Sequence, residues 1–81
     1  MRLPRDLTGA ELVRRLAKFG YGVTRQTGSH MRLTTTQAGE HHITIPRHPS
    51  LRVGTLNAIL RDVAEHLDIP RQTLLATLFE K

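Results

Sequence analysis

The chain has 81 residues, with 12 Lys and Arg against 7 Asp and Glu, and it contains neither Cys nor Trp. This length is too short for the common nucleotide-binding α/β folds and barrels, so any catalysis has to use a compact site on a small scaffold. The lack of Cys excludes disulfide frameworks, thiol catalysis and zinc sites with Cys ligands. We therefore interpret residues 1–81 as one small basic domain.

Positive charge is concentrated in the first part of the chain. Residues 1–32 hold seven basic and two acidic residues, a net +5, whereas residues 61–81 hold three and four, a net −1. This asymmetry predicts a polyanionic partner, with nucleic acid as the first candidate and an anionic membrane surface as the second. The sequence shows neither a signal peptide nor a membrane span, so we expect a cytoplasmic protein without a membrane partner.

A first helix is predicted to begin after Thr8. Thr8 and Glu11 have the spacing of a capping box, and Gly20 is suited to the left-handed conformation that ends a helix. The apolar residues between them recur at helical spacing. They are Leu12, Val13, Leu16 and Ala17. The helix should therefore bury one side and expose a basic one.

From residue 21 to residue 45 the apolar period changes to two, which is typical of strands. Turn signals at residues 27–29 and 37–40 divide this stretch into three antiparallel strands. One face of the sheet should pack on the helices through Val23, Met31, Leu33, Ile43 and Ile45. Alternation then places on an open, polar face Thr24, His30, Arg32, Thr34, His42 and Thr44.

Two helices are predicted to follow the sheet. Gly54 and Thr55 precede an amphipathic stripe, and Pro70 begins a short last helix. The stripe consists of Leu56, Ile59, Leu60, Val63 and Leu67. The last helix carries Leu74, Leu75, Leu78 and Phe79. The predicted fold class is α+β, in the order α-β-β-β-α plus a short C-terminal helix, with the helices on one face of a three-stranded antiparallel sheet.

Several short motifs follow one another along the chain in a specific order. They are residues 12–16 (LVRRL), 19–21 (FGY), 25–30 (RQTGSH), 46–49 (PRHP) and 54–56 (GTL). From about Leu3 to Leu60 this order resembles the HicA family of toxins, also called YcfA-like. The resemblance implies a double-stranded-RNA-binding-domain-like fold, mRNA interferase activity as a toxin of a type II toxin-antitoxin system with a role in stress response, and a HicB-type antitoxin as partner. It also implies that His30 is catalytic and that Gly28 and Ser29 form its supporting loop.

His30 is also a chemically suitable residue for RNA cleavage, independently of the family resemblance. Cleaving RNA without a metal needs a group that takes the proton from the 2′-OH, a group that protonates the leaving oxygen, and positive charge near the phosphorus. Imidazole can perform both proton transfers near neutral pH, and Arg32 can supply charge. Arg25 has the same strand parity as Val23, so it should point away unless the hairpin end twists. The alternative is a partly exposed strand histidine with no task.

Candidate RNA contacts are the basic side chains and one helix start. Gly54 and Thr55 offer free N–H groups to an anion, although an ordinary helix cap is the commoner case. For His48 we weigh a second proton carrier, a phosphate contact and, as the favoured option, a loop residue packed on the sheet. The full predicted RNA-binding set is Arg14, Arg15, Lys18, Arg25, Arg32, Arg47, His48, Arg52 and Thr55. The helical cations of this set could equally form only a solvated face.

No metal or other cofactor is expected. His41 and His42 look like a ligand pair, but neighbours on a strand point to opposite faces. His66 lies near a helix end and should interact with the helix dipole or with solvent. The sequence supports three hypotheses of function. They are a metal-independent endoribonuclease toxin, a non-catalytic RNA-binding module of the same fold, and a protein-interaction domain whose open sheet face binds another chain.

Overall fold

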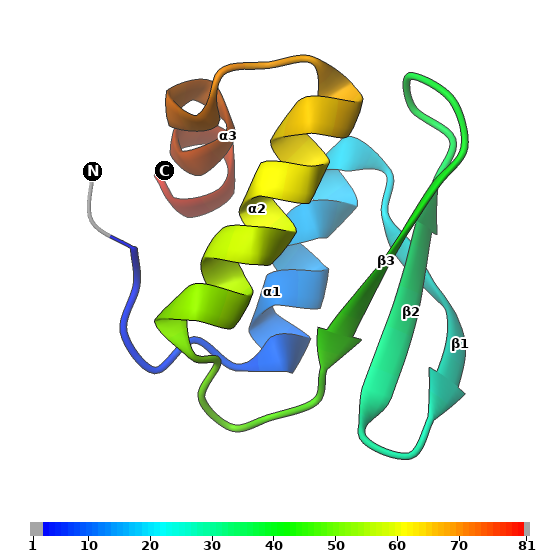
Figure 1. The fold of residues 1–81 in the computed structure, drawn as a ribbon, viewed down its shortest axis with the longest axis vertical. Coiled ribbons are helices and arrows are strands. Elements are labelled where there is room, and N and C mark those ends of the chain that lie inside the picture. Colours follow the sequence, from blue (N-terminus) through cyan, green and yellow to red (C-terminus); the bar gives the residue numbers. More distant parts are fainter. Residues whose placement is uncertain (1–2, 81) are drawn as a thin grey trace.

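A computed structural model describes residues 3–80 of the chain. The elements follow the predicted order, with the first two helices packed on one face of a three-stranded sheet and the last helix packed against those two, away from the strands (Figure 1). They are α1 (Gly9–Leu16), a 3₁₀ turn (Ala17–Phe19), β1 (Gly22–Thr27), β2 (His30–Thr35), β3 (His41–Pro46), α2 (Val53–Leu67) and α3 (Arg71–Phe79). The predicted α+β fold class is therefore confirmed.

The first helix begins and ends where the sequence predicts. The Thr8 hydroxyl accepts a hydrogen bond from the backbone N–H of Glu11 at 3.0 Å, and Gly20 ends the 3₁₀ turn with φ 81°. Leu12 and Leu16 are fully buried, but Ala17 is exposed, contrary to its place in the predicted stripe. The reason is that the helix tightens into the 3₁₀ turn at this residue, which ends the helical periodicity.

The sheet has the order β1-β2-β3, and both strand pairs are antiparallel. Gly28, with φ 56°, is the first of two residues in the turn between β1 and β2, as a type II′ hairpin turn requires. Met31, Leu33, Ile43 and Ile45 are buried under the helices, as predicted. Val23 pairs with Leu33 on the same face, yet it is 45% exposed because the helices leave the edge strand β1 largely uncovered.

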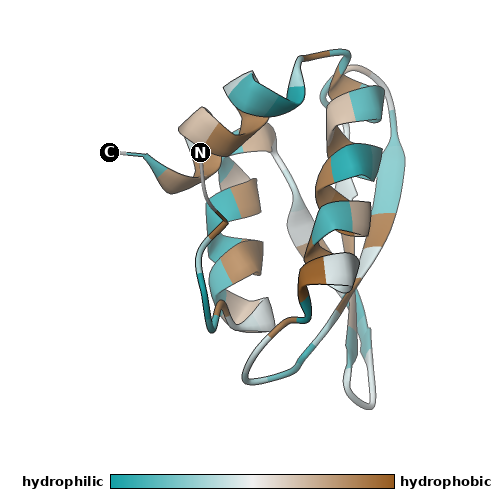
Figure 2. Cartoon of the chain, turned by 60° about the vertical axis from the view of Figure 1, so that its left-hand side comes forward, coloured by the Kyte–Doolittle hydropathy of each residue, from teal (hydrophilic) through white to brown (hydrophobic). Residues whose placement is uncertain are grey.

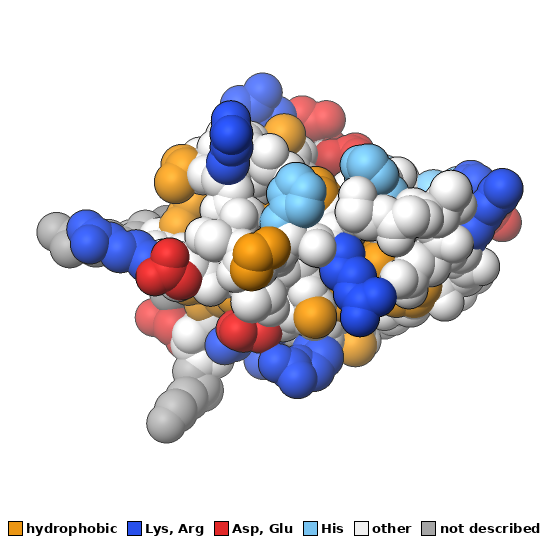
Figure 3. Space-filling model, turned by 90° about the horizontal axis from the view of Figure 1, so that it is seen from below, with side chains coloured by type: hydrophobic (Ala, Val, Ile, Leu, Met, Phe, Trp, Pro, Cys, Tyr) orange, Lys and Arg blue, Asp and Glu red, His pale blue; other side chains and the backbone are white. Residues whose placement is uncertain are grey.

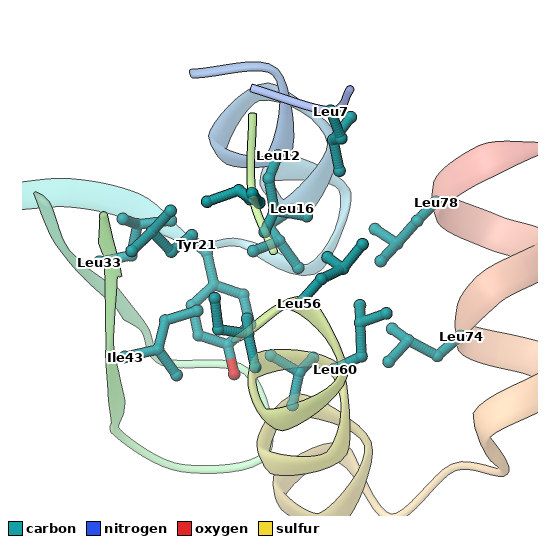
Figure 4. Packing of buried hydrophobic residues seen from close by; sticks show 14 of the residues in the cluster. Leu7, Leu12, Leu16, Tyr21, Leu33, Ile43, Leu56, Leu60, Leu74 and Leu78 are labelled. Carbon is teal, nitrogen blue, oxygen red and sulfur yellow. The ribbon is translucent and has the colours of Figure 1, made fainter. Parts of the chain in front are cut away.

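The core extends from the sheet through α1 and α2 to α3 (Figure 4). Leucines of all three helices meet there, including Leu12, Leu60 and Leu78. The apolar sides of the helices face inward and their hydrophilic sides face outward (Figure 2). α2 begins at Val53, so Gly54 and Thr55 belong to its first turn instead of preceding the helix. None of the described helices has the length and apolar content needed to span a bilayer.

α3 is held on the core by α1 as well as by its own leucines. Leu74, Leu75 and Leu78 of α3 are buried. The Arg15 guanidinium donates to the Leu78 carbonyl at 2.9 Å, and the Lys18 ammonium donates to the Thr77 carbonyl at 2.8 Å. Cations near a helix C-terminus satisfy its free carbonyls and interact favourably with its dipole. The last helix therefore completes the fold.

Candidate active site

His30 is the first residue of β2, directly after the turn between β1 and β2, and its side chain is exposed. In the sheet it lies opposite Thr27 of β1 and Pro46 of β3. Since the buried residues of β2 are Met31, Leu33 and Thr35, alternation directs the His30 ring to the open face. The structure thus places this imidazole where a ligand can reach it.

Two backbone hydrogen bonds and one close backbone approach fix the chain around His30. Arg47 N–H donates to the Ser29 carbonyl at 2.6 Å, and Gly9 N–H donates to the His48 carbonyl at 3.1 Å. A Cβ atom on Gly9 would lie 2.2 Å from the Pro46 carbonyl oxygen, so only glycine allows this close approach. The start of α1, the β1–β2 turn and the loop after β3 are therefore joined at one end of the molecule, which we call the turn end (residues 28–30, 46–55 and 8–9).

The turn end collects the predicted Gly28, Ser29 and His30 with the predicted loop cations. Arg47, His48 and Arg52 are exposed there, and Thr55 lies in the first turn of α2. Figure 3 views this end and shows histidine and basic side chains exposed on it. The His48 side chain is exposed, so the favoured interpretation of packing on the sheet is wrong. Its loop runs past the end of the sheet to the start of α2 (Figure 1).

The open face of the sheet is a grid of three rows. Opposite residues in antiparallel strands share a face, so the register defines each row. The first row is Thr27, His30 and Pro46; the second is Arg25, Arg32 and Thr44; the third is Gly22, Thr34 and His42. The expectation that Arg25 points away from His30 is therefore wrong. The register of β1 shifts between Val23 and Arg25, and this β-bulge reverses the parity of the strand.

The cations of α1 do not join this face. Arg15 and Lys18 are bound to the end of α3, and the Arg15 guanidinium also lies 5.4 Å from the centre of the Phe79 ring. Arg14 is exposed on the same helix. Because α1 covers the opposite side of the sheet, these three side chains are separated from His30 by the sheet itself.

The structure contains a second polar cluster that the sequence does not indicate. The Tyr21 hydroxyl and His41 Nδ1 share a hydrogen bond of 2.8 Å, and His41 Nε2 lies 3.1 Å from Asp62 Oδ1. The His41 and His66 rings stack with 4.2 Å between their centres. His66 Nε2 donates to the Gln37 and Gly39 carbonyls at 2.9 and 3.0 Å, so the expected dipole or solvent role of His66 is wrong. Only the tertiary fold brings these groups together.

His42 points to the other face from His41, as predicted. Its Nδ1 lies 2.8 Å from the Thr34 hydroxyl and its Nε2 lies 2.9 Å from Glu40 Oε2. Within residues 3–80, no group of three or more His, Asp or Glu side chains is arranged so that it could hold a metal ion. Both histidines instead have partners within the chain that account for their orientation.

Tyr21 provides an optical test of the second cluster. Burial, and to a smaller degree the negative charge of Asp62, raises the pKa of Tyr21 from 10.0 to about 12. Because Tyr21 is the only tyrosine of the chain, the ultraviolet absorbance of phenolate reports on this residue alone. We expect a midpoint near pH 12 in the folded protein and near pH 10 in denaturant.

The same shift has a consequence for stability. Between pH 10 and pH 12 the unfolded chain loses the tyrosine proton first, so the free energy of unfolding should fall as the pH rises through this range. Tyr21→Phe should lack this component, which chemical denaturation at several pH values measures. A phenolate midpoint near pH 10 in the folded protein would contradict the burial of the Tyr21 hydroxyl beside Asp62.

Two surface grooves lie away from the open face. One lies between α2 and α3 and is lined by residues that include Arg61, Glu65 and Arg71. The other lies between residues 3–6 and the start of α2. Neither contains His30. The surface around His30 is formed by exposed polar and basic residues, which suits contact with a polymer backbone.

Comparison with known proteins addresses the family directly. Residues 9–64 match the protein family described as HicA toxin of bacterial toxin-antitoxin. The chain belongs to the HicA toxin family. The match covers α1, the sheet and most of α2, and so includes the HicA open face and most of the turn end. No curated protein and no solved structure shows significant similarity to this HicA chain. The resemblance seen in the sequence is confirmed, and the toxin role follows from the family.

Proposed function

We propose that this toxin is a metal-independent endoribonuclease that cleaves mRNA with His30 as its general acid and base. The observation that supports this proposal most is the position of His30 in the first row of the open face, with Arg32 in the next row. The imidazole is exposed, and the positive charge beside it suits a phosphodiester. Because the proposed substrate is mRNA, the toxin would act in the cytoplasm.

The proposed reaction is an internal displacement at phosphorus. His30 takes the proton of a 2′-OH, the 2′ oxygen attacks the neighbouring phosphorus, and the bond from phosphorus to the 5′ oxygen breaks. The imidazolium then returns its proton to the leaving 5′ oxygen. Guanidinium groups stabilise the charge that builds on the phosphoryl oxygens. Gly28 and Ser29 serve this chemistry by forming the turn that presents His30.

The proposed partner is a HicB-type antitoxin. The turn end and the open face are exposed in the isolated chain, so a protein that covers them would block access of RNA to His30. A basic surface of this kind favours a partner with complementary acidic groups. Arg47, Arg52 and the β-sheet arginines are the contacts that such a partner would share with RNA.

Incubation of the purified protein with labelled single-stranded RNA in excess chelator tests this function. We expect cleavage that continues in the chelator and stops when the antitoxin is added, because imidazole and guanidinium groups supply the whole chemistry. Retention of intact RNA would instead identify a non-catalytic RNA-binding module. If RNA is neither bound nor cleaved, a role in protein interaction replaces the nuclease proposal.

A further inference from the structure

Arg25 and Arg32 form an unusual pair in the second row of the open face. They lie directly opposite each other in β1 and β2, and both are exposed. Like charges at such positions repel each other and destabilise a sheet. Within the described part of the chain, neither arginine has an ion-pair partner. The ion pairs there join Asp62 and Glu40 to histidines. The free protein thus holds two unbalanced guanidinium groups side by side.

The β-bulge in β1 creates this pair. Thr24 is the extra residue, and without it Arg25 would share the helix-facing side with Val23. The Thr24 hydroxyl bonds to the Thr34 hydroxyl at 2.8 Å and donates to the Arg32 carbonyl at 3.4 Å, which holds the bulge in place. An irregularity that costs ladder hydrogen bonds and brings two positive charges together requires a compensating gain. A bound anion would supply such a gain.

We propose that Arg25 and Arg32 together bind a single phosphate of an unpaired RNA strand, next to the phosphate at which the strand is cleaved beside His30. This inference rests on the proposed function. His30 and Arg32 are two residues apart on one face of β2, a separation of about 6.8 Å. That separation is close to the distance between neighbouring phosphates of an extended strand. Two guanidinium groups that face one phosphate can each donate in a bidentate manner, and Thr44 completes the row with a hydroxyl.

The same geometry selects unpaired RNA over a duplex. His30 and the arginine pair lie along a straight strand, so they contact a backbone that runs along β2. The displacement also requires the 2′ oxygen to approach from behind the bond that breaks, a near-attack geometry. The regular A-form backbone does not present its 2′ oxygen in this way, whereas an unpaired strand can distort to do so. The substrate class is therefore a single-stranded segment.

Binding measurements in a His30→Ala background test the inference without cleavage. The variants are Arg25→Gln, Arg32→Gln and the double variant, with Arg61→Gln on α2 as the control for loss of one exposed positive charge. We expect each single substitution at the pair to weaken binding of a single-stranded oligonucleotide roughly 10-fold. The double variant should lose little more than either single variant, because both arginines hold one phosphate. Arg61→Gln should change affinity by less than a factor of about two.

Salt dependence distinguishes one shared phosphate from two separate ones. For single strands, each phosphate contact contributes about 0.7 to the slope of log affinity against log salt. The double variant should therefore reduce the slope by about 0.7, and a reduction of about 1.4 would contradict a shared phosphate. A duplex of the same sequence should bind more weakly and be insensitive to the pair. Equal binding of the duplex would overturn the assignment of an unpaired strand.

Two outcomes separate this inference from the proposed function. If the parent protein cleaves RNA but the arginine variants bind as well as Arg61→Gln does, the inference alone fails. If the parent neither binds nor cleaves RNA, the proposed function fails with it. Thermal unfolding guards against misfolding, because removing one of two repelling charges should leave the midpoint unchanged or raise it.

Discussion

Replacement of His30 by Ala is expected to abolish RNA cleavage and toxicity while the fold stays intact. General acid–base catalysis by a positioned side chain contributes about 10²–10⁴-fold to rate, so cleavage should fall by at least the lower figure. The ring is exposed and stands outside the hydrophobic core, so its loss should change stability by less than about 0.5 kcal/mol. Cleavage rates with labelled RNA and thermal unfolding measure the two effects separately.

His42→Ala is the matched control for this substitution. His42 lies on the same face, in the third row, and is also exposed, but its ring is engaged by Thr34 and Glu40. Its removal should leave most of the cleavage in place. Equal loss in both variants would mean that the histidines serve a common binding or folding role. Full activity in His30→Ala would refute the catalytic assignment.

Truncation before Pro70 is expected to unfold the protein, although α3 lies outside the family match at residues 9–64. Leu74, Leu75 and Leu78 are each at most 5% exposed. Loss of a buried leucine side chain costs about 2–5 kcal/mol, and three such losses approach or exceed the 5–15 kcal/mol that stabilises a typical domain. Circular dichroism of the chain that ends at residue 69 should therefore show little native structure.

Single substitutions in α3 measure its contribution to stability in a chain that still folds. Leu78→Ala should lower the free energy of unfolding by about 2–5 kcal/mol, whereas Gln72→Ala on the exposed side of α3 should stay within about 0.5 kcal/mol. Chemical denaturation measures both values. A truncated chain that unfolds at the same midpoint as the full chain would show that α3 is dispensable for the core.

Much of the fold could be predicted because apolar spacing and capping agree along most of the chain. Thr8 and Gly20 bound the first helical segment, and β2 and β3 alternate because one face of each is buried. The parity of β1 could not be predicted in the same way. Every residue of this edge strand is exposed, so its sequence carries no apolar alternation after Val23. The bulge, and with it the position of Arg25, is therefore invisible in the sequence.

The candidate site could likewise be predicted only where local sequence signals determine it. His30 and its turn follow from local signals and family motifs, and both lie where predicted. Contacts between distant elements could not be predicted. Arg15 and Lys18 are basic residues on an amphipathic helix, and nothing local indicates that they bind the end of α3. The stacking of His66 on His41 likewise depends on how α2 crosses β3.

The bulged strand β1 also bears on how other chains can meet this protein. A regular edge strand is a template on which another chain can add a strand and start aggregation. In β1 the bulge at Thr24 interrupts the pairing pattern, and Arg25 adds charge at the rim. Self-association through this border should therefore be suppressed even at high concentration. An antitoxin that covers the basic face therefore finds no regular edge at β1 to which it could add a strand.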